Sequence, residues 1–370
     1  MKENAKNRKL KKIILILLIV LLALILTAAL AFTLITGYLF NRLGSAVQNE
    51  TISVIPPHME DFETDPPITT QEPTTVPADE TQPSEGNDPT QPTTQPPATE
   101  PPPPPTRPDF DWPEVEKLQS DDVINILLVG KDASSADGRP RTDSMILLSI
   151  NKRTNSLSMV SLMRDLYVQI PGGYSDNRIN AAYRFGGIDL LNATIEKNFG
   201  IVIDGNIEVD FQQFATIINI LGGVEIELTQ AEASYMQRLG FSKIVAGKNL
   251  LGGEAALQYC RIRMIDSDHQ RTERQRKLLL IIADRAQDMS ISQVWEMIDK
   301  VLPYVRTDMS EKELVSVTTA GVQALLSGNG IRSSKVPQSG HYYGANIMGM
   351  QVMVPNLYQC NQYLKSFIYG

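Results

Sequence analysis

Apolar residues fall into two kinds of segment from about residue 123 to the end of the chain. Short continuous runs rich in Ile, Leu and Val are typical of buried strands, and they predict strands at residues 123–129, 144–150, 157–163, 166–170, 202–209 and 224–228. Segments with helical spacing predict helices at residues 188–198, 211–221, 231–239, 254–263 and from about 269 through 282, with two more after capping boxes at Ser290 and Ser310. This order of strands and helices predicts an α/β fold, a three-layer αβα sandwich with a mixed central sheet.

The first forty residues contain a long apolar segment. Residues 13–40 form a run of 28 without a charged side chain, which exceeds the roughly 20 residues that span a bilayer as a helix. Residues 1–12 are mostly basic, so we predict a single-pass protein of the cell membrane with a cytoplasmic N-terminal tail and everything after the span outside the cell. The alternative is a cleaved signal peptide that ends near Ala29-Leu30-Ala31, which also exports the rest of the chain.

Residues 41–109 have the composition of a linker. Seventeen of the 23 prolines lie between Pro56 and Pro108, and Thr, Gln, Asp and Glu fill the gaps. Such a segment cannot bury a core, and its prolines favour an extended, semi-rigid spacer, so we predict a disordered Pro/Thr-rich linker. The predicted organisation is therefore a tail (1–12), a transmembrane helix (13–40), an extracellular linker (41–109) and an extracellular folded domain (110–370).

Charged residues cluster where the first two predicted strands meet. Asp132 would leave the first strand, and Arg141 and Asp143 would enter the second. In an extended segment Arg141 and Asp143 share a face, because side chains alternate with a period of two. The loop between the strands should lie at the edge of the sheet, where functional sites usually form, and the two aspartates are candidate metal ligands.

A second cluster of charge lies near the middle of the domain. Five arginines fall within sixteen residues of a mildly acidic domain, at positions Arg261, Arg263, Arg271, Arg274 and Arg276. Arg271, Arg274 and Gln275 should share one face of a helix whose N-terminal amides also attract anions. This pattern indicates an anionic ligand rather than nucleic acid. The alternative readings are a solvated helix face compensated by Glu273 and, for the separate Arg164-Asp165 pair, a structural ion pair.

Several motifs resemble those of the LytR-CpsA-Psr (LCP) family from about residue 122 to the C terminus. They are Gly130-x-Asp132, Arg141-Thr142-Asp143-Ser144-Met145, Arg164-Asp165, Arg178-Ile179-Asn180-Ala181-Ala182-Tyr183, Leu221-Gly222-Gly223-Val224 and Arg261-x-Arg263 through Asp268, Arg271 and Arg274-Gln275. One departure is Met163, where family members often have Pro before the Arg-Asp pair. The resemblance implies a phosphotransferase that moves teichoic acid, capsular polysaccharide or a similar glycopolymer from a polyprenyl diphosphate carrier to peptidoglycan in Gram-positive cell envelopes.

The resemblance also implies roles for individual residues. Asp132 and Asp143 would hold Mg²⁺, with Mn²⁺ as an alternative, and Asp132, Asp143, Arg164 and Arg271 would be the catalytic groups. The diphosphate would be bound by Arg141, Arg164, Arg261, Arg263, Arg271 and Gln275. The polyprenyl tail would need an apolar channel, for which the helix faces of residues 188–199, 211–221 and 278–282 are candidates, although ordinary core is an equally good reading.

Other readings stay open at the level of sequence. A diphosphate hydrolase would use water as the acceptor, and a non-catalytic envelope protein would bind the lipid carrier or a wall polymer without turnover. The sequence names neither the glycopolymer nor the general base. Cys260 and Cys360 are the only cysteines, and either a disulfide or two free thiols is compatible with their positions.

Overall fold

The computed structural model describes residue 108, residues 110–132 and residues 140–370. The predicted tail, the predicted transmembrane helix and nearly all of the predicted linker lie outside these residues, so those three predictions stay predictions. Within the described part of the chain, no helix is both long enough and apolar enough to cross a membrane.

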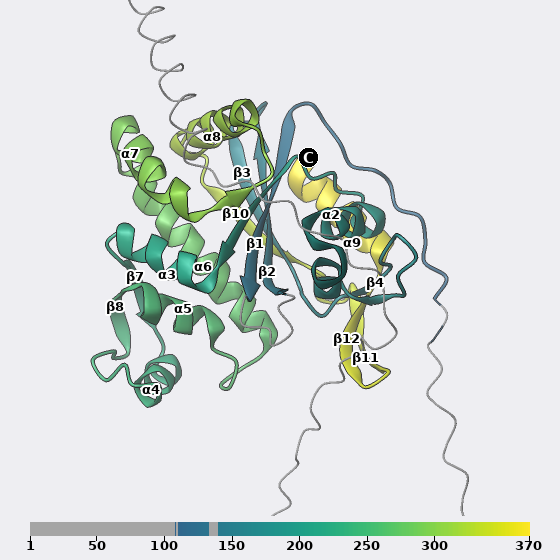
Figure 1. Cartoon of the computed structure of the whole chain (residues 1–370), viewed down its shortest axis with the longest axis horizontal. Coiled ribbons are helices and arrows are strands. Elements are labelled where there is room, and N and C mark those ends of the chain that lie inside the picture. Colours follow the sequence, from purple (N-terminus) through teal and green to yellow (C-terminus); the bar gives the residue numbers. More distant parts are fainter. Residues whose placement is uncertain (1–107, 109, 133–139) are drawn as a thin grey trace, which may run out of the picture.

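A mixed six-stranded sheet forms the centre of the domain (Figure 1). Its strand order is β10 (Ile331–Val336), β3 (Ser156–Leu162), β2 (Arg141–Asn151), β1 (Val123–Asp132), β6 (Gly205–Asp210) and β9 (Arg306–Thr307). β1 runs antiparallel to β2 and parallel to β6, which makes the sheet mixed. The central strands are long apolar runs because helices cover both of their faces.

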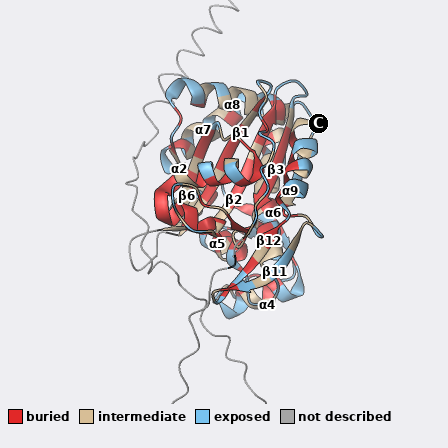
Figure 2. Ribbon diagram, turned by 90° about the vertical axis from the view of Figure 1, so that its right-hand side faces the viewer, coloured by how far each residue is buried: buried red, intermediate tan, exposed pale blue. Residues whose placement is uncertain are grey.

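The two faces of the sheet bury alternate side chains of β1. Leu127 and Val129 pack in one core with α2 (Ile179–Phe199) and α9 (Leu357–Leu364). Ile126 packs in another core, with side chains from α7 (Ile291–Val301) and α8 (Glu311–Leu326). Figures 1 and 2 show these helix layers on either side of the buried strands, which confirms the predicted α/β fold with a mixed central sheet.

A smaller unit with its own core lies beside the sheet. It contains the hairpin of β7 (Val224–Leu228) and β8 (Gly247–Leu251), together with α3 (Phe211–Ile220), α4 (Gln230–Arg238) and α5 (Gly253–Arg261). Capping boxes begin α3 at Asp210 and α4 at Thr229, which satisfies backbone donors that would otherwise be unpaired. The long α6 (Asp268–Gln287) contributes Leu278 to this core and therefore joins the unit to the rest of the domain.

Most of the predicted elements are present, and both capping boxes in the C-terminal half are confirmed, at Ser290 and Ser310. The strand predicted at 166–170 is confirmed only in part: β4 (Tyr167–Val168) forms there, but it is short and pairs with β5 (Asn177–Arg178) outside the central sheet. The helix predicted at 188–198 is the second half of α2, which continues back to Ile179 through a kink at Gly186 and Gly187. The positive φ of Gly187 explains why helical spacing breaks there.

The pattern of apolar residues did not predict the hairpin in the C-terminal part of the fold. A hairpin of β11 (Tyr342–Ile347) and β12 (Met350–Pro355) projects from the domain, and its turn has positive φ at Met348 and Gly349 (Figure 1). β11 mixes aromatic, small and polar residues, and the apolar run of β12 extends only over Val352-Met353-Val354 before Pro355, so neither strand has the long apolar run of the central strands.

Candidate functional site

Asp143 lies at an irregularity in the pairing of β1 with β2. Gly130 pairs with Ser144, but Lys131 pairs with Thr142, so Asp143 is the extra residue of a β-bulge. A bulge re-aims the side chain of its extra residue and interrupts the alternation of a strand. Asp143 lines an apolar cavity, whereas Arg141 lines a separate crevice with Arg178 and Arg184, so the two side chains do not line the same space.

Three arginines from distant parts of the chain converge on one oxygen of this carboxylate. Oδ1 of Asp143 lies 3.1 Å from Nη1 of Arg164, 3.1 Å from Nη2 of Arg263 and 3.6 Å from Nη1 of Arg271. Burial alone would raise the pKa of Asp143, but the three guanidiniums outweigh burial and lower it. The carboxylate is therefore ionised throughout the physiological range.

Two further aspartates and one further arginine extend this arrangement into a network. Asp268 Oδ1 lies 2.8 Å from Nη2 of Arg271 and 3.6 Å from Nε of Arg164. Asp165 bridges Arg164 and Arg178, at 3.6 Å and 3.7 Å. We call the seven residues Asp143, Arg164, Asp165, Arg178, Arg263, Asp268 and Arg271 the arginine cluster; with four arginines and three aspartates, it has an excess of positive charge.

The burial of the arginine cluster favours an anionic ligand. Arg271 is only 2% exposed, and burial together with the neighbouring Arg164 and Arg263 lowers its pKa despite Asp268 and Asp143. Within the described part of the chain, Nε of Arg164 and Nε of Arg271 are buried without a hydrogen-bond acceptor. Buried donors in this state are uncommon and are typically explained by a bound anion or water.

Arg274 fixes the loop that carries Arg263. Its guanidinium donates to Glu232 Oε1 of α4 at 2.7 Å, to the carbonyl oxygen of Ile262 at 3.1 Å and to both carboxylate oxygens of Asp266. The predicted common face of Arg271, Arg274 and Gln275 is thus only partly formed. Arg271 and Gln275 are four residues apart and line the same cavity, whereas Arg274 turns toward α4.

Replacing Arg274 with Met should lower the free energy of unfolding by about 3–5 kcal/mol, because the buried carboxylate of Glu232 loses its partner. Arg274 and Thr229 outweigh burial and lower the pKa of Glu232, so this stabilisation is complete above the unfolded-state pKa of about 4.3 and is lost as the pH falls through the lower folded-state value. Denaturant unfolding of the wild type and Arg274→Met at pH 7 and pH 3 measures both effects.

The matched control for this prediction is Lys248→Met, which breaks the exposed ion pair with Glu225 and should leave the unfolding midpoint unchanged. If the difference in the free energy of unfolding between the wild type and Arg274→Met is as large at pH 3 as at pH 7, the effect does not come from the carboxylate of Glu232.

An apolar cavity of about 260 Å³ opens beside the arginine cluster. Its apolar wall combines one face of the sheet with α3, α5 and α6, including Leu128, Ile207, Phe214, Ile217 and Leu279. Its polar end holds four of the predicted site residues, Asp143, Arg261, Arg271 and Gln275. Arg261 also stacks over the ring of Phe211 at 4.5 Å from the centroid. The cavity therefore has an apolar body and a charged mouth.

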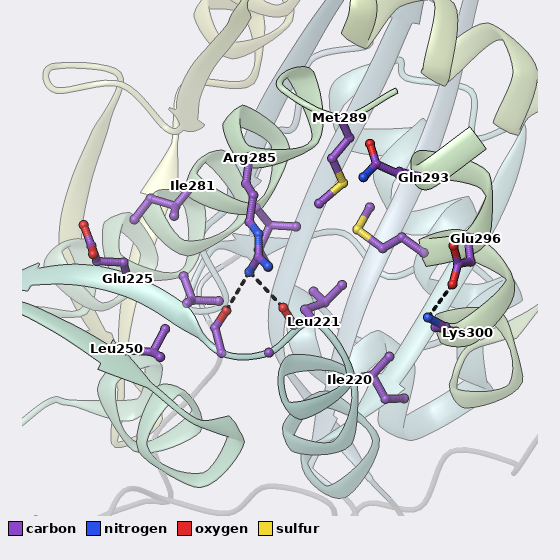
Figure 3. Close-up of a pocket in the computed structure, with 15 residues that line it drawn as sticks. Ile220, Leu221, Glu225, Leu250, Ile281, Arg285, Met289, Gln293, Glu296 and Lys300 are labelled. Carbon is purple, nitrogen blue, oxygen red and sulfur yellow. Dashed lines mark hydrogen bonds and ion pairs between the residues drawn. The ribbon is translucent and has the colours of Figure 1, made fainter. Parts of the chain in front are cut away.

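A larger cavity of about 610 Å³ lies further along the same helices (Figure 3). Ile220 and Ile282 line it, and each follows by three residues a side chain of the first cavity, Ile217 or Leu279. Arg285 extends into it and donates to the carbonyl oxygens of Leu221 and Gly223, at 2.8 Å and 3.3 Å, which caps the end of α3. It contains none of the predicted site residues.

The helix faces proposed for an apolar channel separate into two groups. Those of α3 and α6 line the first cavity through Phe214, Ile217 and Leu279. Ile188 and Leu191 of α2 instead pack in the main core together with Leu127 and Val129, which occupy the other face of the sheet. The α2 face is therefore core and not a wall of this cavity.

The remaining candidates are placed as follows. Asp132 pairs in register with Arg141 at the end of the β1–β2 ladder, as the second pair beyond the bulge. Within the described residues, no group of three or more His, Cys, Asp or Glu side chains is arranged to hold a metal ion. Cys260 and Cys360 are free and lie in different cores, and burial raises the pKa of both thiols to about 12, so neither acts as a nucleophile.

Asp165, Arg178 and Asp268 belong to the cluster although the sequence did not single them out as site residues. Asp165 lies two residues before the short β4, Arg178 belongs to β5, and Asp268 begins α6. All three stand in the motifs that carry the family resemblance, and the Arg164-Asp165 dipeptide proves to be both an ion pair and part of the site.

Both the sequence and the fold match known proteins. The model of the LytR_cpsA_psr family matches residues 81–365. A "Polyisoprenyl-teichoic acid--peptidoglycan teichoic acid transferase TagU" of Bacillus mycoides is 29% identical over 63% of this chain and 75% of its own length. The same-named protein of Oceanobacillus iheyensis is 36% identical over 56% of this chain and 65% of its own length.

A solved structure has the same fold. It is the LytR-CPS2A-psr family protein YwtF (TagT) with bound octaprenyl pyrophosphate lipid, at a TM-score of 0.53 and 22% identity, with 70% of this chain and 96% of that chain covered. Because the family model spans most of the chain, this protein belongs to the LytR_cpsA_psr family.

Proposed function

We propose that this protein transfers a glycopolymer, teichoic acid or a capsular polysaccharide, from a polyprenyl diphosphate carrier to peptidoglycan. The observation that carries the proposal is the position of the arginine cluster at the mouth of an apolar cavity. A lipid diphosphate has the same division into an apolar tail and a doubly charged head. The names of the TagU relatives and the octaprenyl pyrophosphate bound to TagT support it further.

The arginines supply what a phosphoryl transfer needs. Such a reaction depends mainly on placement and on neutralising charge at the phosphoryl oxygens. Arg164, Arg263 and Arg271 offer forked donors that suit paired phosphate oxygens better than lysine does. The aspartates hold these guanidiniums in place before the substrate arrives, so the arginines require little reorganisation on binding.

The proposed reaction replaces a phosphoanhydride bond with a phosphoester bond. A hydroxyl oxygen of peptidoglycan bonds to the phosphorus nearer the glycan, and the bond from that phosphorus to the bridging oxygen breaks. Polyprenyl phosphate leaves with the electron pair, and the hydroxyl proton passes to a base. Arg271 and Arg164 would stabilise the negative charge that builds up on the phosphoryl oxygens.

Asp132 and Asp143, at the end of the β1–β2 ladder, would be the ligands of Mg²⁺, or of Mn²⁺ in its place. Mg²⁺ is commonly held by one or two carboxylates together with substrate phosphates and water, and Asp132 and Asp143 provide two hard oxygen ligands on neighbouring strands. The lowered pKa of Asp143 keeps that ligand ionised. When bound, the ion would neutralise charge on the diphosphate.

The proposed location follows from the substrate. A single-pass anchor at residues 13–40 with a cytoplasmic N terminus would place the folded domain outside the cell, where carrier lipid and peptidoglycan meet. The Pro-rich linker would set its distance from the membrane.

A transfer assay tests the proposal with the full-length chain, Mg²⁺, a polyprenyl diphosphate-linked teichoic acid precursor and peptidoglycan. Mass spectrometry of the product should find a covalent glycan–peptidoglycan linkage and free polyprenyl phosphate. Release of glycan phosphate without that linkage would instead identify a hydrolase. Tight lipid binding without turnover in Mg²⁺ or Mn²⁺ would identify a non-catalytic envelope protein.

Filling the first cavity should weaken binding of the carrier. Ile217→Trp places a larger ring in the cavity and should reduce the amount of polyprenyl lipid that copurifies with the full-length chain, measured by mass spectrometry. The matched control is Ile291→Trp, since Ile291 is 60% exposed on α7 and lines neither cavity. Equal lipid content in the two variants would exclude this cavity as the tail site.

A further inference from the structure

A pocket of about 440 Å³ lies between the β11–β12 hairpin and the chain segment at residues 110–113. Aromatic rings dominate its wall: Phe110 and Trp112 stack with their centroids 4.9 Å apart, and Tyr343 is 58% exposed. Asp111 and Asn356 add polar side chains, both exposed. None of the described residues that line the pocket is cationic.

The aromatic wall is held in place by contacts outside the pocket. Trp112 Nε1 donates to Asp176 Oδ2 at 2.7 Å, and the ring of Phe110 packs against the buried Tyr167 at 5.6 Å between centroids. Tyr343 pairs in register with Val354, which packs with Phe110 and Trp112 in the same small core. The rings of Phe110 and Trp112 are thus arranged before any ligand binds, and the pairing of β11 with β12 fixes the backbone position of Tyr343.

The same hairpin is also tied to the arginine cluster. The backbone N–H of Met353 donates to the carbonyl oxygen of Asp165 at 2.9 Å. The hydroxyl of Tyr342 lies 3.1 Å from Nε2 of His269, the residue next to Asp268. The pocket therefore has a fixed position relative to the arginine cluster, and it is built from elements that take no part in the apolar cavity.

We propose that this aromatic pocket is a saccharide subsite. The inference rests on the proposed function: a carrier-linked glycan has lipid on one side of its diphosphate and sugar on the other, and the acceptor is also a glycan. A sugar ring has an apolar face of C–H bonds and a polar edge of hydroxyls. The faces of Phe110, Trp112 and Tyr343 can pack against the C–H face of a sugar. Asp111 and Asn356 can form hydrogen bonds with its hydroxyls.

The charge of the lining separates this pocket from a phosphate site. Phosphate oxygens would require cations, which gather in the arginine cluster and not here. The aromatic and polar lining is instead suited to a neutral sugar of the glycan that lies some distance from the diphosphate.

Tryptophan fluorescence reports on this pocket directly. The chain has two tryptophans, Trp112 in the pocket and Trp295 in α7, so Trp295→Phe leaves Trp112 as the single reporter. The full-length Trp295→Phe protein is titrated, without carrier lipid or metal, with a lipid-free teichoic acid oligomer and separately with a peptidoglycan glycan-strand fragment. We expect a saturable change in Trp112 emission with at least one of them.

Two tyrosine substitutions make the test specific. Tyr343→Ala should weaken saccharide binding at least about fivefold, since it removes one aromatic face. Tyr358→Ala removes a tyrosine of similar exposure, 62%, from α9 outside the pocket and should change nothing. Thermal unfolding of both variants verifies that the fold is intact.

Each outcome bears on the proposal. A response to the teichoic acid oligomer assigns the subsite to the donor, and a response to the peptidoglycan fragment assigns it to the acceptor. No response to either ligand, or equal weakening by Tyr358→Ala, overturns it. Failure of the proposed function is seen separately, as a lack of transfer in the mass-spectrometric assay while the fluorescence response persists.

Discussion

Replacing Asp143 with Ala or Asn should reduce glycopolymer transfer on the order of 10²- to 10³-fold, as the loss of a key electrostatic group in an active site does. Its carboxylate joins three arginines and is one of the two proposed ligands of Mg²⁺. The measurement is the initial rate of formation of the glycan–peptidoglycan linkage by the full-length chain at saturating Mg²⁺. Asp189→Ala, at an exposed position of α2, is the control and should retain full activity.

Replacing Asp143 with Asn should affect the affinity for inorganic pyrophosphate differently in the absence and in the presence of metal. Removing a negative charge from among the arginines should strengthen that binding, whereas the gain in affinity on adding Mg²⁺ should disappear. Calorimetry of Asp143→Asn with and without Mg²⁺ measures both. Transfer at the wild-type rate by either Asp143 variant would remove this residue from the mechanism.

Arg271→Met should lower kcat/KM for transfer by about 10²- to 10³-fold, because a buried guanidinium is lost beside the proposed phosphoryl group. Arg271→Lys should recover only part of this loss, since an ammonium keeps the charge but not the fork. The measurement is steady-state kinetics with the lipid-linked precursor, together with the affinity for inorganic pyrophosphate.

Arg276 provides the matched control on the same helix. It is also buried, at 8% exposure, but its Nε donates to Ser333 Oγ on β10 rather than to the arginine cluster. Arg276→Met should therefore destabilise the protein while leaving the affinity for pyrophosphate unchanged. Equal loss of pyrophosphate affinity in the two variants would mean that Arg271 acts through the fold alone.

The sequence predicted the central strands well because their apolar runs are long and buried on both faces. It predicted poorly where local pattern is weak, as in β11 and β12, whose strands mix exposed Tyr343 with buried Val352 and Val354. The strand expected at 166–170 is shorter than predicted for a different reason. The apolar residues of this run pack in the cores between α2 and the β11–β12 hairpin, and they do not join the central sheet.

The convergence of Asp143 with Arg164, Arg263 and Arg271 was expected from the motifs, but its geometry was not. Nothing in the sequence around Asp143 marks a bulge, because the register of β1 with β2 is set by long-range pairing. The separation of Arg274 from Arg271 likewise depends on Glu232, a residue of another helix. Spacing along the chain identifies candidate partners, but tertiary packing determines which of them are in contact.

The β-bulge has a consequence for how this family can vary. The ladder from Val123 to Gly130 fixes the register of the two strands, so the position of Asp143 does not depend on how many residues connect Asp132 to Arg141. Insertions and deletions in that connection should be tolerated during evolution, whereas loss of a single residue between Arg141 and Ser144 would turn the carboxylate to the other side of the sheet.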